Sequence, residues 1–387
     1  MKKRLAAIIL FVIFMFPAWA VMELDEDDIS MEEWIDLSEE EESTLVFDTD
    51  GYLTVTITCT GDFTIGGDNY HNKTAFYDVL NNADNQGDIN FTMKNVRDIL
   101  KADNLTIVNF EGTFTDSQYV PRNKRDNKFL FNISPNYANV LPDNSIEAVS
   151  LANNHVMDHG EEAYEETKKT LREAGVIYST QEDIGEFHVN DTITIAMLSY
   201  LCIDMYGKPA GGYDTFEEKV CADITRAKEQ YPLVIVSFHW GNEPTKTDPA
   251  RGYQPTKNQL RLGRMAVDAG ADLIIGNHSH RIQPIEYYNG SYICYSLGNF
   301  CFSGNDNPSD MNAILFQTRF RFSKSGNVAN TGIKIIPIQI TSIKGKNNYQ
   351  PTPITDEMKQ KSVIQTMVDN GKKYCEYSLN EYPLEWK

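Results

Sequence analysis

Carboxylate, carboxamide and imidazole side chains occur in five short polar clusters of this sequence, each directly after an apolar run. The clusters are Thr60-Gly61-Asp62, Asn109-Phe110-Glu111, Ala152-Asn153-Asn154-His155, His239-Trp240-Gly241 and Asn277-His278-Ser279-His280. They offer anionic oxygen, neutral carbonyl oxygen and imidazole nitrogen without a thiolate, which suits Mn, Fe, Zn or Co in a reactive site rather than a structural zinc. The candidate metal ligands are Asp62, Glu111, Asn154, His239, His278 and His280.

Six ligands exceed the four that one tetrahedral ion accepts. We therefore expect two divalent ions, about 3.5–4 Å apart, that share a bridging carboxylate in the arrangement used for hydrolysis. His278 and His280 form the strongest pair, because residues two apart on a strand face the same side.

Each candidate also has an ordinary structural explanation. These explanations are turn formation for Asp62, Asn153 and Asn154, a solvated loop for Glu111, and a buried histidine with a satisfied hydrogen bond for His239. All of them would have to hold together, so we favour the metal site.

The apolar runs before the clusters are rich in β-branched residues and alternate with amphipathic stretches, which is typical of βαβ units and predicts an α/β fold. The expected strands are Leu53–Thr60, Leu105–Phe110, Ile146–Leu151, Ile193–Tyr200, Leu233–His239, Asp272–Gly276 and Tyr292–Leu297, and Ala313–Phe322 with Ile333–Ile343 forms a terminal β-meander. The expected helices are Phe91–Lys101, Glu161–Ala174, Thr215–Gln230, Thr256–Ala269 and Thr355–Lys373. Open α/β sheets bind ligands at the carboxyl ends of their strands, so the five clusters should meet at one edge.

The N-terminal segment differs from the rest of the chain. Lys2, Lys3 and Arg4 precede an apolar run over 5–16, and Ala18-Trp19-Ala20 provides the small residues of a cleavage site. This pattern predicts a signal peptide over residues 1–20 and an extracytoplasmic protein. The alternative is an uncleaved membrane anchor, although the apolar run is short for a span of about 20 residues.

An acidic stretch follows, with fourteen Asp or Glu and no Lys or Arg between Glu23 and Asp50. Such a stretch repels itself, so we expect a disordered spacer over residues 21–52. When these acids and the three basic residues at the start are taken from the totals of 55 and 35, the remainder has 41 acids and 32 bases. A net charge of −9 argues against nucleic-acid binding, which needs a basic surface.

The six cysteines form no Cys-x-x-Cys motif, which argues against a metal–thiolate site. In an exported chain Cys202 could pair with Cys221, or Cys294 with Cys301, but buried free thiols fit a domain of this size equally well.

Six motifs follow one another in a fixed order. They are Gly61-Asp62, Asn109-Phe110-Glu111, Ala152-Asn153-Asn154-His155-Val156-Met157-Asp158-His159-Gly160, His239-Trp240-Gly241-Asn242-Glu243, Gly276-Asn277-His278-Ser279-His280 and Tyr295-Ser296-Leu297-Gly298-Asn299-Phe300. From about Leu53 to Ser303 this order resembles the CapA family of poly-γ-glutamate capsule-synthesis proteins. That family is similar in fold to calcineurin-like metallophosphoesterases, which implies a four-layer αββα sandwich with two stacked mixed sheets.

The resemblance implies that the six residues named above are metal ligands and that His155 donates a proton to the leaving group. One departure bears on activity: phosphoesterases of this fold carry Asp-x-His in the first motif, whereas Asp62-Phe63-Thr64 has Thr at the His position. One ion site therefore lacks an imidazole and should bind its ion weakly or not at all. Asn277 and Ser279 also differ from the residues common in relatives, but neither is an expected ligand.

Further candidates surround the ligands. Asp158 could orient the His155 ring as a second catalytic residue, or it could cap the helix that begins near Glu161. Glu243, Ser296 and Asn299 could contact substrate or support the ligands, and loop packing explains them as well. His71, His159 and His188 lie outside the ligand set and are interpreted as surface or packing residues.

We therefore interpret the chain as an exported CapA-like hydrolase of capsule or cell-envelope polymer metabolism, in which a metal-bound hydroxide attacks a phosphoester or an amide. A rival is a non-catalytic assembly or export factor that keeps the fold and holds an anionic chain, and a third is a secreted phosphodiesterase or nucleotidase. Thr64 favours the assembly factor, whereas the Asn154-His155 pair favours catalysis. The expected partners are an anionic polymer or phosphoester and a membrane capsule-synthesis complex, without nucleic acid.

The expected organisation has four segments. A signal peptide at 1–20 and the acidic spacer at 21–52 precede a CapA-like metallophosphoesterase domain at 53–345. Residues 346–387 form a C-terminal helix and tail.

Overall fold

The computed structural model describes residues 45–68, 75–125, 129–203 and 213–387, which belong to the compact unit Leu45–Lys387. The predicted signal peptide, the predicted spacer up to residue 44 and His71 lie outside the described residues. Leu45 and Phe47, at the end of the predicted spacer, are partly buried against the core. Within the described part of the chain, no helix has the length and apolar character needed to span a membrane.

The first of two large sheets has eight strands and carries the N-terminal half of the site. Its order is β17 (Thr352–Pro353), β16 (Val328–Gln339), β15 (Asn312–Ser323), β1 (Tyr52–Thr64), β3 (Leu105–Phe110), β6 (Ala148–Ser150) and β7 (Ile177–Ser179), and β14 (Asn299–Phe302) also pairs with β1. β1, β3, β6 and β7 are parallel, whereas β15, β16 and β17 are antiparallel additions. The predicted C-terminal meander is the β15–β16 hairpin.

The second sheet has six strands and carries the C-terminal half of the site. Its order is β12 (Ile285–Tyr288), β13 (Ser291–Cys294), β11 (Leu273–Asn277), β10 (Leu233–Trp240), β9 (Ile193–Cys202) and β8 (Gly185–Asn190). β9, β10, β11 and β13 are parallel, and both edge strands are antiparallel. A third, small sheet contains β2 (Gly67–Asp68), β5 (Phe131–Ile133) and β4 (Thr113–Phe114).

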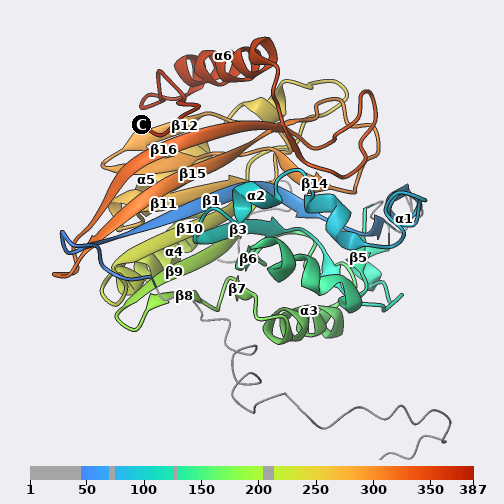
Figure 1. The fold of residues 1–387 in the computed structure, drawn as a ribbon, viewed down its shortest axis with the longest axis horizontal. Coiled ribbons are helices and arrows are strands. Elements are labelled where there is room, and N and C mark those ends of the chain that lie inside the picture. Colours follow the sequence, from blue (N-terminus) through green and yellow to red (C-terminus); the bar gives the residue numbers. More distant parts are fainter. Residues whose placement is uncertain (1–44, 69–74, 126–128, 204–212) are drawn as a thin grey trace, which may run out of the picture. The chain divides into compact units, whose positions relative to one another are not determined.

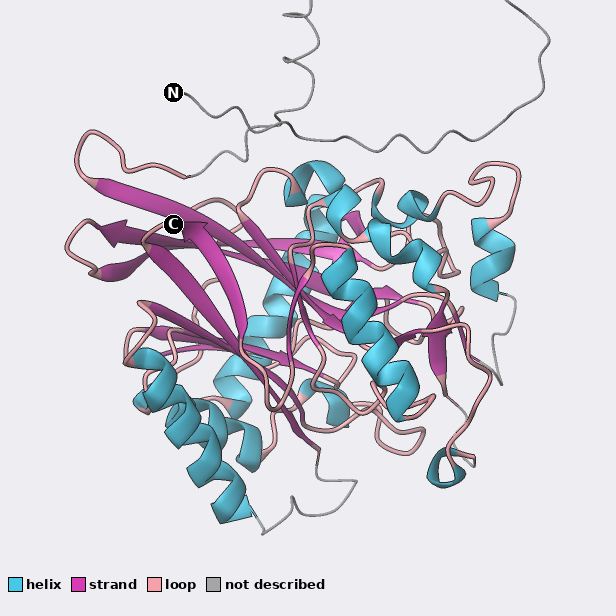
Figure 2. Cartoon of the chain, turned by 90° about the horizontal axis from the view of Figure 1, so that it is seen from below, coloured by secondary structure: helices cyan, strands magenta, loops and turns pink. Residues whose placement is uncertain are grey.

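The two large sheets pack face to face over a shared apolar core. Alternate residues of each strand point to opposite faces, so Val55 and Ile57 of β1 meet Ile195 of β9 and Ile235 of β10 in this core. The other faces are covered by helices (Figures 1 and 2). Burial on both faces explains why the central strands read as continuous apolar runs.

Helices of the first half cover the first sheet, and helices of the second half cover the second. α1 (Ala75–Leu80) and α3 (Glu161–Glu173) bury Phe76 and Leu171 against it, while α4 (Tyr213–Lys228) and α5 (Lys257–Asp268) bury Val220 and Leu262 on the second sheet. The predicted α/β class with two mixed sheets between helical layers is confirmed.

The last helix has a different position. α6 (Glu357–Tyr374) contributes Val363, Met367 and Val368 to the core between the sheets. It lies beside β12 and β16 and covers the side where the two sheets part (Figure 1).

The predicted helix Phe91–Lys101 is wrong. The segment forms a 3₁₀ turn at Ile89–Met93, where the Lys94 N–H reaches the carbonyl of Phe91, and then the one-turn helix α2 (Arg97–Leu100). An apolar period close to three suits both helix types, so the sequence pattern did not distinguish them. Two predicted strands are also shorter than expected, since Ile146–Leu151 reduces to β6 and Tyr292–Leu297 ends at Cys294.

Candidate metal centre

The five polar clusters meet where the parallel strands of both sheets end. Glu111 directly follows β3, Asn154 follows β6, and His239 is the second-last residue of β10. Asp62 lies inside β1, which continues to Thr64 past an irregularity between Cys59 and Asp62 instead of ending at Thr60. The predicted convergence on one edge thus spans two sheets.

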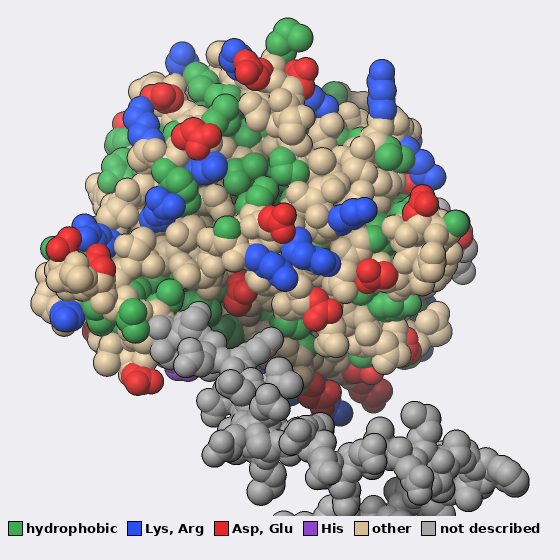
Figure 3. Space-filling model, viewed as in Figure 1, with side chains coloured by type: hydrophobic (Ala, Val, Ile, Leu, Met, Phe, Trp, Pro, Cys, Tyr) green, Lys and Arg blue, Asp and Glu red, His purple; other side chains and the backbone are tan. Residues whose placement is uncertain are grey.

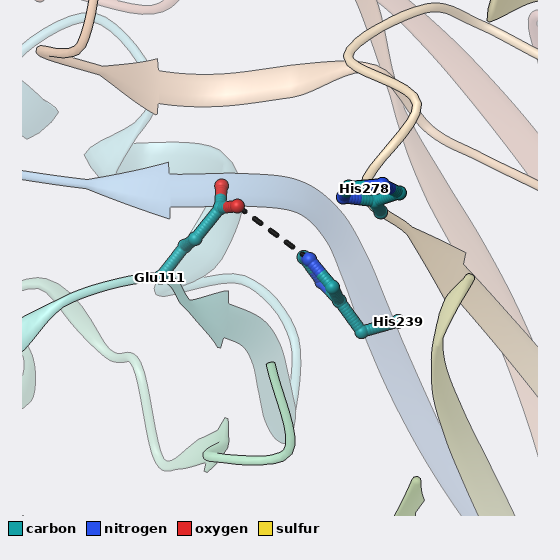
Figure 4. A group of neighbouring side chains, drawn as sticks. All are labelled: Glu111, His239 and His278. Atoms are coloured by element: carbon teal, nitrogen blue, oxygen red, sulfur yellow. Dashed lines mark ion pairs between the residues drawn. The ribbon is translucent and has the colours of Figure 1, made fainter. Parts of the chain in front are cut away.

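The ligand candidates form two groups that share one carboxylate. Glu111, His239 and His278 make the first group, and Asp62, Glu111 and His280 make the second, with the ligand atoms of each group within 4.8 Å of one another. Figure 4 shows Glu111 and His239 facing each other, with Glu111 Oε1 3.5 Å from His239 Nε2. Asn154 Oδ1 lies 2.7 Å from the same imidazole nitrogen, so Asn154 belongs to the first group.

Several ligand atoms lack any hydrogen-bond partner among the described residues. These atoms are both carboxylate oxygens of Glu111 and both ring nitrogens of His278, and all four are buried. Buried polar groups are normally hydrogen-bonded. A divalent ion bound between the Glu111 carboxylate and the His278 imidazole would satisfy these unpaired atoms. The residues present therefore fit one or two such ions.

The electrostatics of two of the ligands, His239 and His278, agree with this fit, whereas the pKa values of Glu111 and His280 are raised. Burial, followed by the nearby carboxylate of Asp62, raises the pKa of Glu111 to about 8. Burial and neighbouring imidazoles hold the pKa values of His239 and His278 well below the usual range, so both rings are neutral, as metal ligands must be. Burial opposes protonation of His280, but the carboxylates of Glu111 and Asp62 raise its pKa to about 10.

The predicted geometry of His278 and His280 is wrong in detail. β11 ends at Asn277, so the two histidines lie in a loop instead of on one strand face. Both have left-handed backbones, with φ of 93° and 51°, a conformation that costs energy and often occurs at functional sites. The loop sends His278 to the first ligand group and His280 to the second.

Asp62 is held in place by its neighbours in both sheets. The amide of Asn109 donates to Asp62 Oδ1 at 2.9 Å, and the backbone N–H of His278 is 3.2 Å from both carboxylate oxygens. The Asp62 N–H donates to the carbonyl of Gly298, which approaches so closely that a Cβ on Gly61 would lie 1.9 Å from that oxygen. Only glycine fits before the ligand.

His155 and Asp158 form a pair at the rim of the cluster. His155 Nδ1 is 2.6 Å from Asp158 Oδ2, and Nε2 on the opposite side of the ring is 3.8 Å from Glu111 Oε1. Burial lowers the pKa of His155, but the carboxylate of Asp158 outweighs it, and the net pKa is raised. Asp158 is not a helix cap: Gly160 occupies that position in α3.

Asp158 is fixed by two further donors. The Lys124 ammonium lies 2.8 Å from Asp158 Oδ1 and 2.7 Å from the backbone carbonyl of Asn154, and the Phe131 N–H donates to Asp158 Oδ2 at 2.9 Å. The Phe131 ring also packs on His155, with centroids 4.6 Å apart. The imidazole is therefore held in one orientation.

The three remaining candidates have different surroundings. Asn299 Oδ1 is 2.8 Å from His280 Nδ1, so it supports a ligand, and Glu243 Oε1 is 3.9 Å from His278 Nε2. Ser296 is buried, and its hydroxyl accepts from the Gly298 N–H, so it shapes the turn that contacts Gly61.

Some residues of the site were missed in the sequence. Asn109 bonds both Asp62 and His239 Nδ1, and its place in the Asn109-Phe110-Glu111 motif could have indicated this role. Lys124 ends a short 3₁₀ turn and Phe131 begins β5, and neither lies in one of the six motifs. Of the other histidines, His159 is buried against the carbonyl of Tyr119, and His188 lies on β8 beside Thr194.

Neither candidate disulfide is present. Cys221, Cys294 and Cys301 are free thiols, so neither the Cys202–Cys221 nor the Cys294–Cys301 pairing forms.

The fold and site define an α/β protein with a buried cluster of carboxylates and imidazoles suited to divalent ions. The chain belongs to the bacterial capsule synthesis protein family PGA_cap, whose model matches residues 56–304. It is similar to the PGA biosynthesis protein CapA of Bacillus subtilis (strain 168), with 31% identity over 294 residues that cover 71% of this chain and 70% of the relative. The capsule biosynthesis protein CapA of Bacillus anthracis is 24% identical over 313 residues, covering 77% of this chain and 71% of that relative.

Two solved structures show a weaker likeness in fold. A putative 5'-nucleotidase from Staphylococcus aureus aligns with a TM-score of 0.42 at 13% identity, covering 81% of this chain and 58% of that chain. The NAD nucleotidase of Haemophilus influenzae aligns with a TM-score of 0.39 at 12% identity, covering 86% and 58%.

Proposed function

We propose that this protein is an exported, metal-dependent hydrolase that acts on a poly-γ-glutamate-like polymer of the capsule or cell envelope. Membership of the capsule-synthesis family and the similarity to CapA proteins support the polymer. The single observation that supports hydrolysis is the arrangement around the buried Glu111 carboxylate. The two ligand groups share this carboxylate, and His155 Nε2 lies 3.8 Å from it.

Each part of the site has a role in this proposal. Glu111, Asn154, His239 and His278 would hold one ion, and Asp62, Glu111 and His280 the other. Bound divalent ions supply an activated water and stabilise the negative charge that develops during hydrolysis. Asp158 holds His155 through Nδ1, which leaves Nε2 free to deliver a proton to the departing group.

The test combines metal analysis with a substrate screen. We expect the purified protein to bind a divalent ion and, when loaded with Mn, Fe, Zn or Co, to hydrolyse γ-glutamyl amides or phosphoesters. Elemental analysis gives the stoichiometry, and release of glutamate or phosphate gives the activity. A metal-loaded protein that cleaves neither class with any of the four metals would contradict the proposal.

One observation favours a second function, a non-catalytic assembly factor. In the first motif Thr64 stands where phosphoesterases of this fold carry a histidine, and its buried hydroxyl has no hydrogen-bond partner among the described residues. With three protein ligands rather than four, the Asp62–Glu111–His280 group should hold its ion more weakly. A protein that kept only the first ion could still hold an anionic chain.

Export leads to a separate prediction. Ala18 and Ala20 supply the small residues of a cleavage site, so we expect the mature protein to begin at Val21. Mass spectrometry of the protein from the native envelope measures the N-terminus. A chain that retains residues 5–16 would instead be an anchored protein.

A further inference from the structure

A buried arginine lines the cavity next to the ligand cluster. Arg281 directly follows His280 and is 6% exposed. The cavity has a volume of about 180 Å³ and is also lined by His155, Glu243 and Asn299. A guanidinium therefore lies in the same cavity as the proposed proton donor.

The guanidinium is only partly satisfied by the protein. Its Nη1 donates to the carbonyl of His280 at 2.7 Å, and its Nη2 donates to the hydroxyl of Ser309 at 2.8 Å. Its central carbon lies 5.8 Å from the ring centre of Tyr253, and the two side chains also share a hydrogen bond. A guanidinium has five N–H donors, so these contacts leave donors for a ligand.

None of these contacts is with a carboxylate. The nearby Asp310 accepts from the Tyr253 hydroxyl at 2.5 Å and from the Asn312 N–H at 2.9 Å, and it forms no ion pair with Arg281 among the residues described. Glu243, the acid in the cavity lining, contacts His278. Because arginine stays protonated, burying it without a counter-ion is unfavourable, and an anionic ligand would relieve that cost.

The rest of the lining suits an extended ligand with apolar segments. Phe129, Phe131 and Phe302 provide an apolar wall for methylene groups. Ser309 also lines a second cavity, of about 470 Å³, on the side of α6. On the face shown in Figure 3, acidic and basic side chains are interspersed, so no broad basic surface competes there for a polyanion.

We propose that Arg281 forms a carboxylate-binding subsite, which holds the free α-carboxylate of a γ-linked glutamyl residue beside the ligand cluster. This inference rests on the proposed polymer substrate and adds the residue that recognises it. The guanidinium fork matches the two oxygens of a carboxylate, a geometry that lysine does not reproduce.

The test measures binding rather than turnover. A short γ-glutamyl oligomer with free α-carboxylates is compared by isothermal titration calorimetry with the same oligomer carrying α-carboxamides. The Mn²⁺-loaded full-length protein carries His155→Ala, so that hydrolysis does not consume the ligand. We expect Arg281→Met to weaken binding of the free acid about 10- to 100-fold and to leave the carboxamide unchanged.

Two further variants keep the test decisive. Arg226, an exposed arginine on α4, is the matched control, and Arg226→Met should bind both oligomers as the parent does. Arg281→Lys retains the charge but loses the fork, so it should give a smaller loss for the free acid alone, and it substitutes for Arg281→Met if that variant does not fold.

Three outcomes would overturn the subsite. They are equal weakening of both oligomers, no weakening in a folded Arg281→Met protein, and an equal loss for a phosphodiester oligomer, which would mark a general anion site. Absence of hydrolysis by the wild-type protein would count against the proposed activity alone, because the binding difference between the two oligomers would still report on Arg281.

Discussion

Glu111→Gln is expected to abolish binding of both divalent ions, whereas His278→Ala and His280→Ala each remove one. Glu111 is the carboxylate that the two ligand groups share, while each histidine belongs to a single group. An amide keeps the shape of the side chain but loses the charge that attracts a cation. Elemental analysis after dialysis should therefore give no ion for Glu111→Gln and a single ion at most for either histidine variant.

The control for this prediction is stability. Burial and Asp62 raise the pKa of Glu111 to about 8, above the ordinary carboxyl value, so ionising Glu111 destabilises the metal-free fold as the pH rises toward 8. At pH 8 the metal-free Glu111→Gln protein should melt at a Tm no lower than that of metal-free wild type. If Glu111→Gln retained as much metal as wild type, Glu111 would not be the shared ligand.

The sequence predicted the site residues better than it predicted their geometry. Glu111 and His239 could be found because each follows or ends a continuous apolar run, and parallel strands in both sheets bring such positions to one edge. The left-handed backbones at His278 and His280 could not be found in this way, because a positive φ is uncommon for any residue other than glycine. The predicted strand pair is instead a loop.

Contacts between the site and residues distant in the sequence also could not be predicted from local sequence patterns. Lys124 and Asp158 are in contact although they are 34 residues apart in the sequence, and Asn109 and His239 are in contact although they are 130 residues apart. Helix and strand periodicities describe neighbours in sequence, and such contacts form only once two sheets have packed together. Arg281 was adjacent to a predicted ligand, but its burial, without an ion pair to any of the described residues, is visible only in the folded protein.

His155→Ala is expected to lower hydrolysis of the substrate found in the screen by about 10²- to 10⁴-fold, the usual contribution of a positioned general acid. His155 is not in either ligand group, so the variant should keep the metal content of wild type. Its Nε2 faces Glu111, while Asp158, Lys124 and Phe131 fix the other side of the pair. The measurements are initial rates under saturating substrate, with elemental analysis of the same preparations.

Asp158→Asn should have a smaller effect than His155→Ala and should change the pH dependence of the rate. The carboxylate raises the pKa of His155, so its loss should shift the fall in activity on the alkaline side to lower pH. His188, which is exposed on β8, provides the matched control, and His188→Ala should retain full activity.

A fully active His155→Ala protein beside an inactive Glu111→Gln protein would exclude His155 as the proton donor. If instead no variant and no wild-type preparation hydrolysed a polymer or phosphoester, the bound ions would serve to hold an anionic chain, and the assembly factor would become the preferred function.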